Sequence, residues 1–140
     1  MKRNTEQDTR KKSALSEYLE MKSELNYWAE RVAEAEQLNT YRSPSASRVP
    51  SRSAPGDPTG TALTMLETAK ENKKRAEEKS KEAMGRVLAI IQTVPKATHR
   101  ILLMRRYIDG LSLDDIADAE YKSRTWVVTN LKAAMEHITL

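Results

Sequence analysis

Cysteine is missing from the 140 residues, so the chain has neither a disulfide framework nor a thiolate metal site. Histidine is scarce, and His99 and His137 are the two examples. They stand too far apart in sequence for a local ligand motif, and neither has a carboxylate or histidine neighbour at a catalytic spacing. We therefore expect no metal site and no cofactor.

Phenylalanine is also absent, and aromatic residues make up 5% of the chain. With so few large apolar side chains, we expect a small core and extended helices. The longest uninterrupted apolar stretch, residues 87–91, is far shorter than the ~20 residues that cross a bilayer. The basic N-terminus is not followed by an apolar segment of the secretory kind, so a cytoplasmic location without a membrane span is expected.

Motifs of catalysis are not recognisable either. The four glycines form no phosphate-binding loop, and the sequence has no Ser-His-Asp set or paired carboxylates in a plausible pocket. Asp114, Asp115 and Asp118 stand near the expected start of a helix, where they complement its dipole. We therefore expect that the protein is not an enzyme.

A long helix is predicted over about residues 9–40, because small and apolar residues recur at alternating spacings of four and three. Glycine and proline are absent from residues 1–43. The seam of this helix reads Ala14, Tyr18, Met21, Leu25, Trp28, Val32 and Ala35.

Residues 42–60 hold four of the five prolines and many serines, which predicts a loop. Whether its arginines, Arg42, Arg48 and Arg52, contact DNA or a partner is left open. A second long helix is predicted over 61–94, capped by Thr59 or Thr61. Its seam reads Ala62, Leu66, Ala69, Lys73, Ala76, Ser80, Ala83, Val87, Ile90 and Val94.

The two long helices differ in charge. Residues 14–40 carry a net charge of −4 and residues 62–94 a net charge of +2. Helices of opposite charge can bury both seams as an antiparallel, coiled-coil hairpin, so residues 1–94 are predicted to form one domain. The basic residues from 70 to 81 alternate with glutamates and are interpreted as a solvated face. The same pattern also permits pairing between two chains.

Residues 95–140 are predicted to form a second domain of three short helices, at about 97–109, 113–119 and 124–138, after Pro95 ends the second long helix. Gly110 can take the left-handed conformation that ends a helix. Ser112, with Asp115 three residues on, matches a capping box, and Ser123 can cap the last helix. The expected fold class is therefore all-α, a helical hairpin followed by a helix-turn-helix.

A helix-turn-helix needs a small residue at the helix crossing and apolar residues on both sides of the turn. The segment supplies such a set: Leu113, Ile116, Ala117, Val127 and Leu131, continued by Ala134 and Ile138. The opposite side of the last helix is then the predicted recognition surface. It carries Arg124, Thr125, Val128, Thr129 and Lys132.

These side chains suit a major groove. Arg124 and Lys132 can bind guanine edges or phosphates, the two threonines can bind either bases or phosphates, and Val128 can contact a thymine methyl group. Further candidates lie on the flanking helix and in the turn. They are Lys96, Arg100, Arg105, Arg106, Lys122 and Ser123.

A resemblance to region four of bacterial sigma factors is carried by the segment VPKATHRILLMRRYIDGLSLDDIADAEYKSRTWVVTNLKAAM. In that family a helix ending in RY is followed by GLSL and then by the motif. The wider layout resembles small phage regulators of the RinA and ArpU type. This resemblance implies transcriptional control of late genes, including packaging genes, in a phage or prophage within a bacterial host cell.

Three residues depart from the pattern of the motif. Tyr121 stands where the turn usually has glycine, and Lys122 where an apolar residue is frequent. The turn is then either rebuilt, or Tyr121 supplies the apolar contact in a register shifted by one residue. Trp126 is large for a docking helix, and it either packs beneath the turn or lies beside the DNA backbone.

The leading hypothesis is a sequence-specific transcription regulator that binds double-stranded DNA, with RNA polymerase as a second candidate partner. Residues 95–140 carry a net charge of only +1, so we expect a homodimer or higher oligomer that spans two half-sites. Two alternatives stay open. One is a small terminase-like packaging protein, which would form a ring, and the other is an interaction module that never binds DNA.

Overall fold

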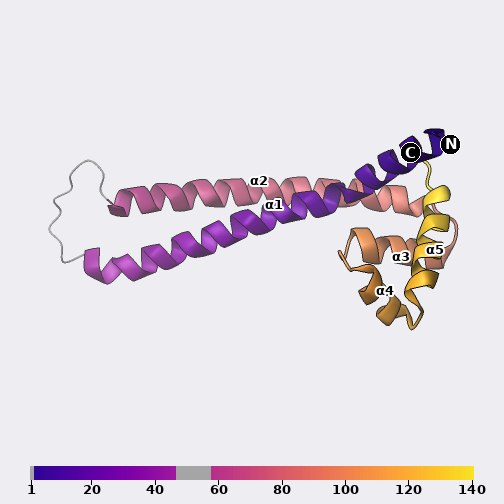
Figure 1. Cartoon of the computed structure of the whole chain (residues 1–140). Coiled ribbons are helices and arrows are strands. Elements are labelled where there is room, and N and C mark those ends of the chain that lie inside the picture. Colours follow the sequence, from indigo (N-terminus) through magenta and orange to yellow (C-terminus); the bar gives the residue numbers. More distant parts are fainter. Residues whose placement is uncertain (1, 47–57) are drawn as a thin grey trace. The chain divides into compact units, whose positions relative to one another are not determined.

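The computed structural model describes residues 2–46 and 58–140, which form helices and connecting turns without a strand (Figure 1). The all-α class is therefore confirmed for the described residues. No helix among them is long and apolar enough to cross a membrane. In chain order the helices are α1 (Lys2–Ala46), α2 (Pro58–Gln92), α3 (Ala97–Tyr107), α4 (Leu113–Glu120) and α5 (Arg124–Glu136).

Two compact units divide the chain, and each long helix contributes to both. Unit 1 comprises Met1–Met21 and Ser80–Leu140, and unit 2 comprises Lys22–Lys79. This division differs from the predicted boundary near residue 94, because the N-terminal part of α1 and the C-terminal part of α2 share a core with α3 and α5. Independent folding of residues 95–140 stays a prediction.

The predicted loop at 42–60 is too long, since helix occupies both of its ends. The first helix continues to Ala46 through Pro44, where the missing N–H removes a single hydrogen bond in the last turn. The second begins at Pro58, which lacks an N–H and so leaves no helical hydrogen bond unmade in the first turn. The prediction that Thr59 or Thr61 caps this helix is wrong, because both lie inside it. Arg48 and Arg52 lie outside the described residues.

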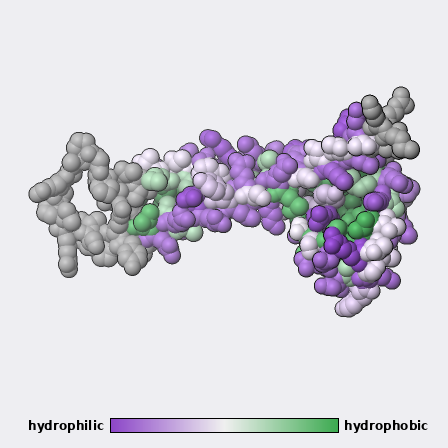
Figure 2. Space-filling model, in the orientation of Figure 1, coloured by the Kyte–Doolittle hydropathy of each residue, from purple (hydrophilic) through white to green (hydrophobic). Residues whose placement is uncertain are grey.

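Unit 2 has a small core of buried apolar side chains. Its core cluster consists of Val32 from α1 with Leu66 and Ala69 from α2, and Trp28 and Ala35 pack against it. The predicted seams therefore meet here as expected. The space-filling view shows mainly hydrophilic colour over these helical segments, as the predicted solvated face requires (Figure 2).

Unit 1 has a larger core. The first core cluster gathers side chains from α1, α2, α3 and α5 and from the segments that follow α2 and α5. Its buried members are Leu15, Val87, Ile91, Val94, Leu103, Ala134, Met135 and Ile138. Two seam predictions are shifted by one residue, because Leu15 and Ile91 are fully buried while Ala14 and Ile90 are half-buried. Packing against α3 and α5 adds a second buried side to each long helix, which a single seam does not anticipate.

Polar contacts hold the N-terminal part of α1 to the rest of unit 1. The Lys11 ammonium donates a hydrogen bond of 2.8 Å to the Met135 carbonyl, near the C-terminal end of α5, where the helix dipole favours a cation. Arg86 of α2 donates from Nε to Glu17 Oε1 at 2.8 Å and also from Nη2 to the same oxygen. The hydrogen bond with Glu17 raises the pKa of Arg86.

Candidate nucleic-acid interface

The three C-terminal helices enclose a second core cluster in unit 1. Its buried members are Leu102, Ile116, Ala117 and Val127, and Leu111, Leu113, Trp126 and Leu131 pack against it. All five apolar residues predicted to set the crossing of α4 and α5 belong to this cluster. Ala117 is buried and small, so the two helices can approach closely at that point.

The turn between α3 and α4 has the predicted chemistry. Gly110 adopts φ = 72°, and the N–H of Leu111 donates to the Arg105 carbonyl, six residues earlier, at 3.0 Å. Ser112 then caps α4, because its hydroxyl accepts a 3.1 Å hydrogen bond from the N–H of Asp115. Both predictions for this turn are confirmed.

The turn between α4 and α5 also contains a left-handed residue followed two positions later by a serine cap, but it is tighter by one residue. Tyr121 adopts φ = 56°, and the N–H of Lys122 donates to the Ala117 carbonyl at 2.9 Å. Ser123 caps α5 as predicted, through a 3.1 Å bond from the N–H of Trp126. Of the two alternatives considered for Tyr121, the apolar contact with the core is wrong, because the side chain is 94% exposed. A rebuilt turn stays a prediction.

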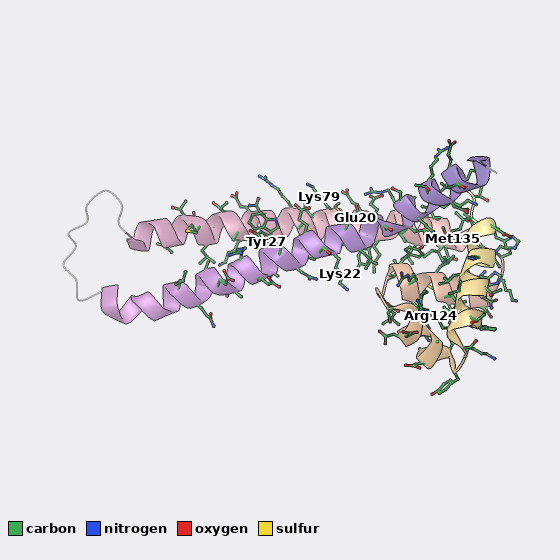
Figure 3. All side chains as sticks on the ribbon, in the orientation of Figure 1. Glu20, Lys22, Tyr27, Lys79, Arg124 and Met135 are labelled. Carbon is green, nitrogen blue, oxygen red and sulfur yellow. The ribbon has the colours of Figure 1, made fainter. Side chains whose placement is uncertain are left out.

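Most of the predicted recognition surface is available on α5. Arg124, Thr125, Thr129 and Lys132 are exposed, and Val128 is half-buried. Arg124 lies at the N-terminal end of the helix (Figure 3). Trp126, Val127 and Leu131 face the second core cluster from the other side of the helix. The four exposed residues therefore form one strip along α5, which we call the α5 strip.

The cations at the start of α5 are only loosely engaged. Arg124 Nε lies 4.0 Å from an oxygen of Asp114 in α4, and both side chains are mostly exposed. The Lys122 ammonium lies 5.5 Å from the centroid of the Trp126 ring. Trp126 itself is half-buried against the second core cluster, which agrees with the first of its two predicted positions. Both cations can therefore reach an anion with little loss of internal bonding.

Arg105 and Arg106, predicted to contact phosphates, are half-buried and have partners inside the protein. Arg105 Nε lies 3.1 Å from a Glu120 oxygen, and Arg106 Nη1 donates to the Leu111 carbonyl at 2.9 Å. Arg100 behaves similarly and donates to two carbonyls that precede α3. These side chains brace the junctions between helices, so the cations of the α5 strip are better candidates for contacts with DNA.

The two histidines lie next to each other in the structure, although they are far apart in sequence. His99 of α3 and His137 after α5 stack at 6.2 Å between ring centroids, with the planes inclined by 21°. His99 is only 6% exposed, and its Nδ1 has no hydrogen-bond partner among the described residues. Within the same part of the chain, no three residues of the metal-ligating types gather around a common point.

Comparison with protein families, with characterised proteins and with solved structures finds no match for this chain.

Proposed function

We propose that the protein is a sequence-specific DNA-binding transcription regulator in which α4 and α5 form a helix-turn-helix and α5 enters the major groove. The observation that carries this proposal is the α5 strip, which is exposed on a helix whose other side is anchored in the second core cluster. A rigid helix with one polar, cationic face is what direct reading of base edges requires.

The spacing of the two strip cations supports a site of a few base pairs. Arg124 and Lys132 are eight residues apart, which corresponds to about 12 Å along a helix. At about 3.4 Å per base pair, that length matches three to four base pairs. Thr125 and Thr129 lie between them on the exposed side, where they can bind bases or phosphates.

The start of α5 offers a second kind of contact. Ser123 uses its hydroxyl for the N–H of Trp126, so other N–H groups of the first turn stay available to an anion. Together with the exposed Lys122 and Arg124, this helix end suits a DNA phosphate at the edge of the groove. Such contacts position the domain without reading sequence.

One copy of residues 95–140, with its net charge of +1, would bind DNA weakly. We propose that two chains bind two half-sites, and that α1 and α2 pair as an antiparallel hairpin that also joins the chains. Control of phage or prophage late genes is the role that the sigma-like and phage-regulator resemblance favours, with RNA polymerase as a further partner.

The test begins with selection of DNA fragments bound by the full chain from a phage-bearing bacterial genome. A shift assay on the best fragment then compares wild type, Arg124→Ala and the matched control Arg31→Ala. Arg31 is also exposed, but it pairs with Glu34 in unit 2. Loss of a base-reading arginine is expected to weaken binding about 5- to 150-fold, and the control should bind like wild type.

Two results would contradict the proposal. One is the absence of any enriched fragment at low salt, and the other is an equal loss of binding in both arginine variants. The packaging alternative predicts a ring in place of a dimer, which a mass measurement in solution distinguishes.

A protein-contact module is the second candidate function, favoured by exposed carboxylates on α4 close to the α5 strip. Asp114, Asp115 and Asp118 are all exposed, and they would oppose a DNA phosphate at close range. In that case Arg124→Ala would leave binding to an RNA polymerase subunit unchanged, and no DNA fragment would be selected.

A further inference from the structure

Tyr121 combines two properties that do not favour folding. It is 94% exposed, the most exposed of the large hydrophobic side chains in the described part of the chain. Its backbone, with φ = 56°, lies in the left-handed region, which disfavours any residue with a Cβ atom. Glycine would occupy the position without strain, so the backbone conformation does not account for a tyrosine here.

The residues after Tyr121 suggest what the ring contacts. Lys122, Ser123, Arg124 and Thr125 are all exposed, and they lead directly into the α5 strip. A phenol beside two cations suits an anionic surface that also offers apolar patches. The DNA backbone has both, because charged phosphates alternate along it with deoxyribose rings.

The backbone conformation also explains why this position is suitable for such a contact. The N–H of Lys122 bonds to the Ala117 carbonyl and Ser123 caps α5, so the turn is held at both ends. A left-handed residue in a fixed turn has a defined Cβ direction, and here that direction leads away from the core, as the exposure of the ring shows. The Cβ atom is thus held on the outer side of the turn, and the ring is accessible to a partner.

We propose that Tyr121 contacts the DNA backbone beside the groove that α5 enters, with its hydroxyl donating a hydrogen bond to a phosphate oxygen and its ring packing on the adjoining sugar. This inference rests on the proposed function and adds to it a positioning residue that touches DNA without reading sequence.

The experiment compares wild type, Tyr121→Gly and Tyr121→Phe as full chains, on the fragment selected above. Tyr121→Gly is expected to raise the thermal midpoint by a few degrees, since the backbone strain is relieved, and to weaken DNA binding about 10-fold. Tyr121→Phe keeps the ring and loses the hydroxyl, so binding should weaken about 3- to 10-fold with an unchanged thermal midpoint. Tyr27→Phe, a matched change at an exposed tyrosine of unit 2, should alter neither quantity.

Salt dependence separates the phenol from its cationic neighbour. A neutral hydroxyl releases no counterion, so both Tyr121 variants should keep the wild-type slope of log affinity against log salt. Lys122→Ala should lower that slope by about 0.9, because one phosphate contact of a cation is lost.

The outcomes are distinguishable from failure of the proposed function. If wild type selects no DNA, the proposed function fails and this inference falls with it. If wild type binds and Tyr121→Gly binds equally tightly, only the role of Tyr121 is overturned. The same holds if the two Tyr121 variants lose affinity equally with Tyr27→Phe, since the effect would then not be local.

Discussion

The turn from α3 to α4 and the turn from α4 to α5 follow the same plan. In each, a left-handed residue is followed by one whose N–H bonds back to a carbonyl of the preceding helix. That carbonyl lies six residues earlier in the first turn, at 3.0 Å, and five residues earlier in the second, at 2.9 Å. In each, a serine comes next and accepts a backbone hydrogen bond of 3.1 Å. The first turn begins with Gly110 and the second with Tyr121. The two turns thus place different residues in the same left-handed region, and glycine is the residue that this region favours.

The surroundings of the two turns differ accordingly. Leu111, after Gly110, packs on the second core cluster, and a Cβ atom at Gly110 would lie 3.5 Å from a Leu19 methyl group. Lys122, after Tyr121, is exposed. The first turn therefore packs against the protein and the second faces outward, which is where a partner can bind.

Placing tyrosine at Gly110 and glycine at Tyr121, each in a separate variant, should have the largest effect on the free energy of unfolding. Gly110→Tyr introduces a Cβ at φ = 72° and should lower the free energy of unfolding by about 1–2 kcal/mol, whereas Tyr121→Gly should raise it. Urea denaturation of both variants checks the signs. If Gly110→Tyr were as stable as wild type, the left-handed backbone would cost little, and the strain assigned to Tyr121 would disappear as well.

The two serine caps should contribute equally to the free energy of unfolding but unequally to DNA binding. Ser112→Ala and Ser123→Ala should each lower the free energy of unfolding by about 1 kcal/mol, because each removes one hydrogen bond at a helix start. In the shift assay, Ser123→Ala should weaken DNA binding, since it loosens the first turn of α5, while Ser112→Ala should not. Equal losses of affinity would show that both turns act only through overall stability.

The coupling free energies of the two ion pairs next to the turns should differ by less than the effects of the cap substitutions. Arg105 and Glu120 lie 3.1 Å apart with side chains 32% and 23% exposed, whereas Arg124 and Asp114 lie 4.0 Å apart with 64% and 74% exposed. Double-mutant cycles should give a coupling of about 0.5–1 kcal/mol for the first pair and about zero for the second. A larger coupling for the second pair would mean that Asp114 competes with DNA for Arg124.

The smallest effect concerns Tyr107, the last residue of α3 before the first turn. Burial raises the pKa of its phenol above the ordinary 10.0, against a lowering by the charge of Arg106. The neutral phenol is favoured in the folded protein, so this contribution to stability is present below pH 10 and is lost as the pH rises through the raised pKa. Denaturation at alkaline pH should therefore show a steeper decline for wild type than for Tyr107→Phe.

The three short helices and their ends were the most predictable part of the protein, whereas the first long helix, predicted over 9–40, runs from Lys2 to Ala46. The three short helices begin where predicted and end within two residues of the predicted positions. Ser112, Ser123 and Gly110 were identified correctly, because a cap or a left-handed ending depends on atoms three to five residues away. The apolar set around Ala117 was also predictable, since helical periodicity alone selects it.

The partners of the cations were not predictable from local patterns. Arg105 and Arg106 were expected to face DNA, yet each bonds to a group presented by a neighbouring turn or helix. The burial of Leu15 in place of Ala14 has a similar origin, because α3 and α5 pack on α1 from a second side.

The sequence by itself determined what short-range physics governs: where the three short helices start, which side of α5 is apolar, and which of its polar residues face outward. Only the tertiary structure decided which distant groups meet. The stacking of His99 on His137 and the exposure of Tyr121 at a strained turn are examples. The reason is that capping bonds and amphipathic periods repeat within one or two turns of helix, whereas these contacts depend on how whole helices pack.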